Sequence, residues 1–238
     1  MWLCTLFYKD IFAGIEYFNN NMKKLTTILA CTILLGACTK ETIRGGGAII
    51  TENRNVPVFT EVQLSGEGEA TILYGTTQQV LVTGYENLLP VYETKMMGTT
   101  LHLQFKPDDY RIRNNNIKVN ITVPSLSYIR VNGSGKVLAG NFTRGDILSA
   151  YINGSGNMQV KDGKYNNVNY VINGSGDIVA NTTEAKEANA EIHGSGRILL
   201  HVLNKLDANI SGSGDIDYWG NPGAVNIQVS GSGKITKK

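Results

Sequence analysis

A cysteine at the end of an apolar segment is the residue with the clearest chemical role. Cys38 follows the tripeptide Leu-Gly-Ala at 35–37, which closes an apolar run over 25–37. Two lysines precede this run, an order typical of a bacterial secretory signal. Small residues before a cysteine fit the lipobox pattern, in which the cysteine thiol accepts diacylglycerol. We therefore expect lipidation at Cys38, and the alternative is an ordinary secretory signal with a chance cysteine.

The same segment divides the chain into a leader and a mature protein. Its apolar run is shorter than the roughly 20 residues that a membrane-spanning helix needs. Residues 1–21 lack the charge pattern of a signal, so we interpret them as a mis-assigned start and 22–37 as a lipoprotein signal peptide. The mature chain then holds one cysteine and no disulfide. Residues 38–55, with three consecutive glycines, are predicted to be a flexible tether ahead of a domain at 56–238.

Charged residues at one position of a repeated motif are the candidates for polysaccharide chemistry. Asp177, Arg197 and Asp215 each follow a Gly-Ser-Gly tripeptide. Enzymes that cleave polysaccharides on β-helices place acids, or calcium-binding aspartates with a basic residue, across neighbouring coils. The two carboxylates would lie two coils apart, at about 10 Å, which exceeds the usual spacing of the carboxylate pair in an inverting glycosidase. The same residues fit a ladder of neutralising charges, so we predict no catalytic residue and no cofactor.

Glycine-rich, histidine and aromatic residues are the remaining candidates for a site. A phosphate-binding loop needs a helix after its glycines, and no helical pattern follows any Gly-Ser-Gly. His193 and His201 lack partners spaced as metal ligands, so we predict no metal site. A surface for sugar rings is one interpretation of four aromatic residues, and cover for the edges of coils is the other. These residues are Tyr151, Tyr165, Tyr218 and Trp219.

The overall composition excludes several classes of protein. The 238 residues are 42% hydrophobic and 18% charged, and 27 of them are glycine. This apolar content argues against a disordered chain, and the absence of a Gly-X-Y period excludes collagen. A net charge of +2 gives no basis for binding nucleic acid, which requires a concentrated basic surface.

The strongest pattern is a tripeptide, Gly-Ser-Gly, that occurs six times at nearly constant spacing. The copies begin at residues 133, 154, 174, 194, 212 and 231, so successive starts lie 18 to 21 residues apart. Apolar or small residues alternate with polar ones before the last five copies, as at Leu148, Ala150 and Ile152. A period of two predicts strands with one buried side. We therefore predict an all-β, single-domain parallel β-solenoid with coils of about 20 residues and a less regular N-terminal half.

Polar residues at equivalent positions of successive coils are predicted to form ladders on the surface. The position before the tripeptide holds asparagine in its first three copies, and the charges after it alternate in sign from Asp177 onward. Both glycines fall in the inward phase, which predicts a corner or a close approach of neighbouring backbones. The candidate surface ladder consists of Asn132, Asn153, Asn173, Asp177, Arg197 and Asp215.

The repeat and the N-terminal half together resemble a known family. Val/Ile-Asn-Gly-Ser-Gly-x-Ile recurs after a half that contains Phe-Thr-Glu-Val at 59–62 and Leu-Leu-Pro-Val-Tyr-Glu-Thr at 88–94. This pattern is similar to the "putative auto-transporter adhesin, head GIN domain" family, a domain of unknown function in Bacteroidetes envelope proteins, over roughly 56–236. The resemblance implies a β-helical domain at the cell envelope and brings no catalytic residues with it.

These observations lead to an expected function. We expect a non-catalytic protein that is anchored by lipid in the cell envelope, at the outer membrane, and acts as an adhesin or surface-binding module. Its partners would be the membrane and a glycan or protein ligand, with no nucleic acid. A periplasmic structural or sensory module is the alternative binding function. A polysaccharide-active β-helix enzyme is the alternative from another class.

Overall fold

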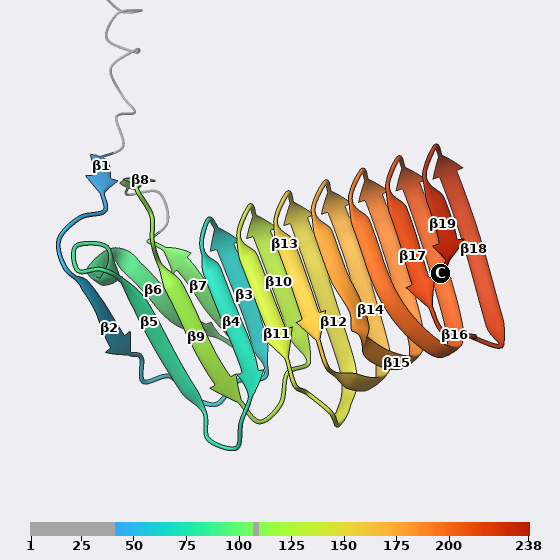
Figure 1. Cartoon of the computed structure of the whole chain (residues 1–238). Helices are drawn as coiled ribbons and strands as arrows, with labels where there is room; N and C mark the ends of the chain where they lie inside the picture. The colour runs from blue at the N-terminus through green and yellow to red at the C-terminus, as the bar shows by residue number, and fades with distance from the viewer. Residues whose placement is uncertain (1–40, 107–109) are drawn as a thin grey trace, which may run out of the picture. The chain divides into compact units, whose positions relative to one another are not determined.

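The computed structural model describes residues 41–106 and 110–238 (Figure 1). The predicted start, the signal peptide at 22–37 and the lipidation site Cys38 lie outside these residues. Residues 42–238 form one compact unit. Within the described residues, no helix has the length and apolar character needed to cross a membrane.

A parallel solenoid forms the C-terminal part of this unit, as the repeat predicts. Its strands pair with the next strand of the same face in register, for example Ile152 with Ile172 and Asn153 with Asn173. The strands are β10 (Tyr128–Gly133), β11 (Lys136–Gly140), β12 (Gly145–Gly154), β13 (Asn157–Lys161), β14 (Lys164–Gly174), β15 (Asp177–Gly194), β16 (Arg197–Gly212), β17 (Asp215–Trp219), β18 (Ala224–Gly231) and β19 (Lys234–Lys237).

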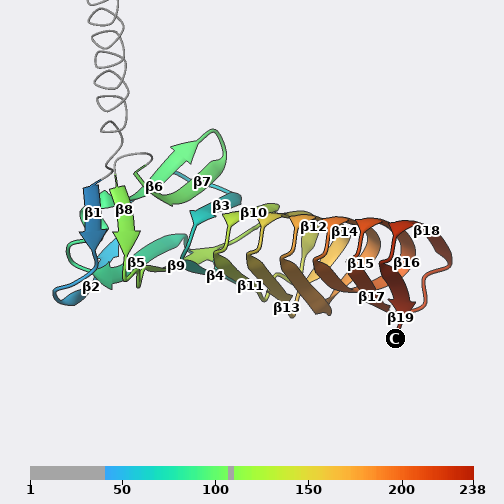
Figure 2. The same ribbon diagram turned by 90° about the horizontal axis from the view of Figure 1, so that it is seen from above.

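Each coil contributes one strand segment to each of two opposed faces (Figure 2). The first face contains β10, β12, β14, the C-terminal parts of β15 and β16, and β18. The second face contains β11, β13, the N-terminal parts of β15 and β16, β17 and β19. β15 and β16 belong to both faces because each strand continues around a corner without a break.

The N-terminal half continues both faces and adds antiparallel strands. β3 (Glu61–Gly66) and β4 (Glu69–Tyr74) flank a degenerate copy of the corner and pair in parallel with β10 and β11. β7 (Thr100–Phe105) and β9 (Lys118–Val123) extend the faces further. β5 (Gln79–Tyr85) runs antiparallel to β9, and β6 (Tyr92–Met97) runs antiparallel to β7 after the 3-10 helix η1 (Leu89–Val91). This half is therefore less regular, as predicted.

The prediction of a flexible tether over 38–55 is wrong for residues 41–55, the part that the structure describes. β2 (Ile49–Asn53) pairs antiparallel with β5, where the hydroxyls of Thr51 and Thr83 lie 2.8 Å apart. β1 (Glu41–Arg44) pairs with β8 (Tyr110–Arg113) in a separate two-stranded sheet. The glycines at 45–47 connect β1 to β2, so the ordered domain begins before residue 56. Long-range strand pairing, which composition does not reveal, fixes this segment.

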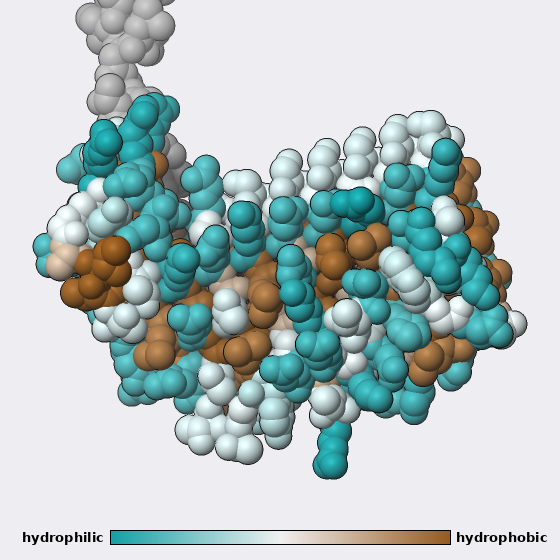
Figure 3. Space-filling view, viewed as in Figure 1, coloured by the Kyte–Doolittle hydropathy of each residue, from teal (hydrophilic) through white to brown (hydrophobic). Residues whose placement is uncertain are grey.

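The Gly-Ser-Gly tripeptides form one corner of the solenoid, which appears as a pale row along the upper edge of Figure 3. The first glycine of every copy has φ between +121° and +138°, a range that disfavours residues with a Cβ. A Cβ added to Gly154 would lie 2.5 Å from the carbonyl oxygen of Gly133 in the preceding coil. The prediction of a corner with closely spaced backbones is confirmed.

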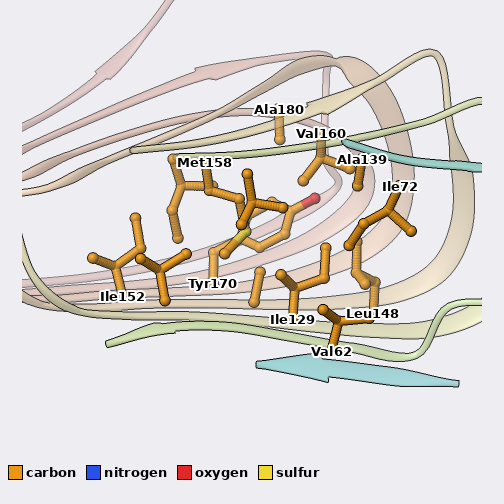
Figure 4. Packing of buried hydrophobic residues seen from close by; sticks show 14 of the residues in the cluster. Val62, Ile72, Ile129, Ala139, Leu148, Ile152, Met158, Val160, Tyr170 and Ala180 are labelled. Carbon is orange, nitrogen blue, oxygen red and sulfur yellow. The ribbon is translucent and has the colours of Figure 1, made fainter. Parts of the chain in front are cut away.

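The core lies between the two faces and is filled by the predicted apolar columns (Figure 4). Ile129, Leu148 and Ile152 from the first face meet Met158 and Val160 from the second, and all are at least 99% buried. The last coil is the exception. Its inward positions are 37–48% exposed, because the described residues hold no strand beyond β18 and β19 to cover them: Val225, Ile227 and Val229.

Candidate functional site

The predicted asparagine ladder is present on the first face, directly before the Gly-Ser-Gly corner. Asn132, Asn153 and Asn173 occupy one register position of β10, β12 and β14. The Nδ2 of Asn153 donates to the Oδ1 of Asn132 at 2.9 Å, and Asn173 donates to Asn153 at the same distance. Each side-chain amide thus uses its neighbours in the stack as partners. The row continues through His193, which pairs in register with Ser211.

The predicted charge ladder lies on the second face, directly after the same corner. Arg197 is in register with Asp177 on one side and Asp215 on the other. Its guanidinium Nη2 lies 3.6 Å from Asp177 Oδ2, and Asp215 Oδ1 accepts a bond of 3.2 Å from the backbone N–H of Lys234. The structure therefore brings all three residues into one row. The two carboxylates are separated by a whole coil that carries the arginine.

The same row extends into the N-terminal half, which the sequence did not indicate. Lys136 is in register with Glu69, and Glu69 is in register with Lys118, whose Nζ lies 3.4 Å from the glutamate. The signs of the charges alternate here as well. Such exposed pairs contribute little individually, roughly 1 kcal/mol at most. Their collective effect is to keep like charges from meeting at neighbouring strands.

A second group of polar and aromatic residues lies on the first face, two or four residues further from the Gly-Ser-Gly corner than the asparagine ladder. The guanidinium carbon of Arg130 lies 5.3 Å from the ring centroids of both Tyr128 and Tyr151, an arrangement that gives cation–π attraction. The hydroxyl of Tyr151 accepts a hydrogen bond of 2.7 Å from Asn169, which in turn accepts one of 2.9 Å from Asn189. The sequence does not reveal this group, because its members differ in type from coil to coil.

The row that contains Asn169 and Asn189 ends in a charged cluster on β16 and β18. Asp207 accepts a hydrogen bond of 2.6 Å from Asn226 and lies 2.6 Å from the Nζ of Lys205. The bond from Lys205, followed by that from Asn226, lowers the pKa of the Asp207 carboxyl. The first face therefore presents amides, one stacked cation and an ionised carboxylate across successive coils.

The four aromatic residues do not form one surface, so that interpretation is wrong. Tyr165 and Tyr218 are buried, at 4% and 8% exposure, whereas Tyr151 lies on the first face and Trp219 ends β17 on the second. Tyr165 and Tyr218 contribute to the core instead. No group of three or more histidine, cysteine, aspartate or glutamate residues in the described ranges could hold a metal ion.

Parallel coils with glycine corners and polar ladders on both outer faces define a parallel β-solenoid protein. A family model described as "Putative auto-transporter adhesin, head GIN domain" matches residues 58–222. The chain belongs to this family. No curated protein sequence matches the chain.

Solved structures show the same fold. A "putative adhesin" from Bacteroides fragilis is 23% identical with a TM-score of 0.65, and the match covers 82% of this chain and 100% of that one. A "putative lipid binding protein" from Parabacteroides distasonis is 24% identical with a TM-score of 0.57, covering 83% and 100%. A "putative adhesin" from Parabacteroides merdae is 22% identical with a TM-score of 0.55, covering 83% and 99%.

Proposed function

We propose that the protein is a non-catalytic, lipid-anchored module of the bacterial cell envelope that binds a glycan or protein ligand through its stacked coils. The observation that carries this proposal is the in-register row Asn132, Asn153 and Asn173. It repeats one hydrogen-bonding group at the spacing of parallel strands, about 4.8 Å. Stacked repeats of this kind offer an extended surface to a partner rather than a single enclosed cavity.

The arrangement of the charge ladder supports a binding role over catalysis. Asp177 and Asp215 lie two strand spacings apart, roughly 10 Å, with Arg197 between them. Asp177 faces the arginine and Asp215 accepts a backbone N–H, so each carboxylate already has a partner. Loss of polymer-cleaving activity in Asp177→Ala or Asp215→Ala, if any such activity were found, would contradict this assignment.

Lipid anchoring is proposed from the order of basic residues, apolar run and cysteine at the N-terminus. Metabolic labelling with a radioactive fatty acid should mark the wild-type chain, and the protein should sediment with membranes. Cys38→Ala should lose the label and leave the membrane fraction. Cys31→Ala, which changes a cysteine within the apolar run, is the matched control and should keep both properties. A labelled Cys38→Ala variant would contradict the proposal.

Ligand binding is tested on purified chain applied to immobilised glycans and extracellular-matrix proteins. Because Asn153 and Asn173 are exposed or half-buried, lysine at either position interrupts the ladder without entering the core. We expect both variants to lose retention by about tenfold, which is the effect of about 1.4 kcal/mol of binding energy. Met97→Lys changes an exposed residue on β6, far from the ladder in sequence, and should bind as wild type. Equal retention of all three variants would contradict a role for the ladder.

A further inference from the structure

A groove lies at the corner of the solenoid opposite the Gly-Ser-Gly tripeptides. It forms where β4 ends at Tyr74 and where two loops, 124–127 and 141–144, connect β9 to β10 and β11 to β12 (Figure 1). These segments enclose a hollow of about 960 Å³, and an adjoining hollow of about 480 Å³ shares Tyr165 and the segment 143–146 with it. We call the two hollows together the corner groove. Their volume falls in the range of sites for small molecules.

Apolar side chains line one part of the larger hollow, and the polar residues Thr60, Ser127 and Asp146 line another part. Phe142 and Leu126 are each only 4% exposed and form part of its wall. The ring of Phe142 packs edge-on against Tyr74, with centroids 6.2 Å apart. Tyr74 and Ile147 are each 51% exposed, although both line the hollow. Exposed apolar side chains gathered around a concave surface indicate a binding site for an apolar group.

The adjoining hollow carries an excess of positive charge. Lys164 is paired with Glu184 at 3.1 Å, and Asp146 accepts a hydrogen bond of 2.8 Å from Asn166. Arg144 and Lys186 also line this hollow, and neither takes part in an ion pair among the described residues. Two cations without carboxylate partners suit an anionic group on a ligand.

A buried tyrosine lies between the two hollows. Tyr165 lines both of them, is 4% exposed, and its hydroxyl has no hydrogen-bond partner in the described part of the chain. A buried hydroxyl without a partner costs free energy, and the ring of Tyr165 forms part of the wall that the two hollows share.

We propose that the corner groove binds one free, single-chain amphiphile with an anionic head group, of which a long-chain carboxylate is the simplest example. The acyl chain lies against Tyr74, Phe142 and Ile147, and the head group lies between Arg144 and Lys186. A concave hollow suits one inserted chain better than the flat surface of a bilayer. This site is separate from the ladders and does not depend on the function proposed for them.

Calorimetric titration with dodecanoate, below the concentration at which it aggregates, tests the proposal. The chain 39–238, which lacks the lipidation site, contains the whole compact unit and serves as the protein. We expect one dodecanoate per chain. Ile147→Glu places a charge in the apolar hollow and should weaken binding at least tenfold. Arg144→Glu should weaken it at least about threefold, the effect of one exposed ionic interaction.

Matched controls change residues of the same kind outside the groove. Met97→Glu alters an equally exposed apolar residue, and Lys95→Glu alters an exposed cation, so both should bind dodecanoate as wild type. Decanol, which lacks the charge, should bind more weakly than decanoate. The proposal is overturned by absence of dodecanoate binding, by unchanged affinity of Ile147→Glu, or by binding to phosphatidylglycerol vesicles without binding to free dodecanoate.

Discussion

Replacing one glycine of the repeated corner tests whether the close approach of successive coils holds the solenoid together. Gly154 has φ of +127°, and a Cβ there would lie 2.5 Å from the carbonyl oxygen of Gly133, where ordinary contact begins at 3.4 Å. Gly66 occupies the same column, in register with Gly133. Its φ is +85°, but a Cβ there would meet no atom within 4 Å. Gly154→Ala and Gly66→Ala therefore share a backbone penalty and differ in the clash.

The structure gives a magnitude for each substitution. A left-handed backbone costs a residue with a Cβ about 1–2 kcal/mol, which is the whole loss expected for Gly66→Ala. At Gly154 the neighbouring coil must also move, and this weakens the backbone bonds from Ser155 to Gly133 and from Asn157 to Gly135, both 3.0 Å long. Each bond contributes about 1 kcal/mol. We expect Gly154→Ala to lose about 3–4 kcal/mol of unfolding free energy in total.

Urea denaturation followed by far-ultraviolet circular dichroism measures both losses. The midpoint of unfolding should fall for each variant, and it should fall about twice as far for Gly154→Ala as for Gly66→Ala. Gly223→Ala is an additional control, because its φ lies outside the left-handed range and the nearest atom to its Cβ would be 4.0 Å away. If the unfolding free energies of Gly154→Ala and Gly66→Ala differed by less than about 0.5 kcal/mol, close backbone approach would be excluded as the cause of the loss.

Three further predictions concern buried and charged groups. Tyr170→Phe should raise the unfolding free energy by about 1 kcal/mol, because this fully buried hydroxyl has no partner among the described residues; a loss of stability in urea would show that the hydroxyl is bonded. Arg197→Glu should destabilise the chain by about 1 kcal/mol at low salt, by aligning three acids in one row, and 1 M salt should reduce the loss; a salt-independent loss would exclude the charge ladder as its cause. The pKa of Asp207 should lie below the ordinary value, so the stability that it contributes is present above the unfolded pKa of about 3.9 and is lost as the pH falls through the folded pKa. A carboxyl titration by NMR should show the Asp207 pKa rising in Lys205→Met and in Asn226→Ala, and an unchanged value in both variants would contradict the assignment.

Much of the fold follows from two local signals in the sequence. The period of two at Leu148, Ala150 and Ile152 places these residues on the buried side, and the repeat of about 20 residues places the next coil in register above them. Gly-Ser-Gly marks the corner because only glycine tolerates both the left-handed backbone and the neighbouring carbonyl. The alternation of apolar residues and the repeated glycines thus determine the strands and the corner of each coil.

Features that depend on distant segments could not be predicted in this way. β2 lacks a buried column, since Ile49 and Ile50 are both exposed, and it is held by its pairing with β5. The second corners within β15 and β16 contain no glycine or proline, so the sequence gives no turn signal there. There Thr183 is buried and donates a hydrogen bond of 2.9 Å to the carbonyl of Val160 in the preceding coil.

The same distinction between local and distant signals applies to the candidate site. The ladder of Asn132, Asn153 and Asn173 was predictable, because identical residues recur at identical positions. The stack of Arg130 on two tyrosines and the corner groove were not, because each joins different residue types from different coils or loops. Such contacts become visible only when the register between coils is known.

Protease treatment of intact cells tests the central claim, that this is a binding module displayed in the cell envelope, most directly. For this experiment an epitope tag is added after Lys238. Cells with a deliberately opened outer membrane serve as the control. We predict that proteinase K removes the epitope from intact cells, because a ligand-binding surface of an adhesin must face the exterior. An epitope that survives until the outer membrane is opened would contradict surface binding, and a periplasmic structural or sensory module would then be the better assignment.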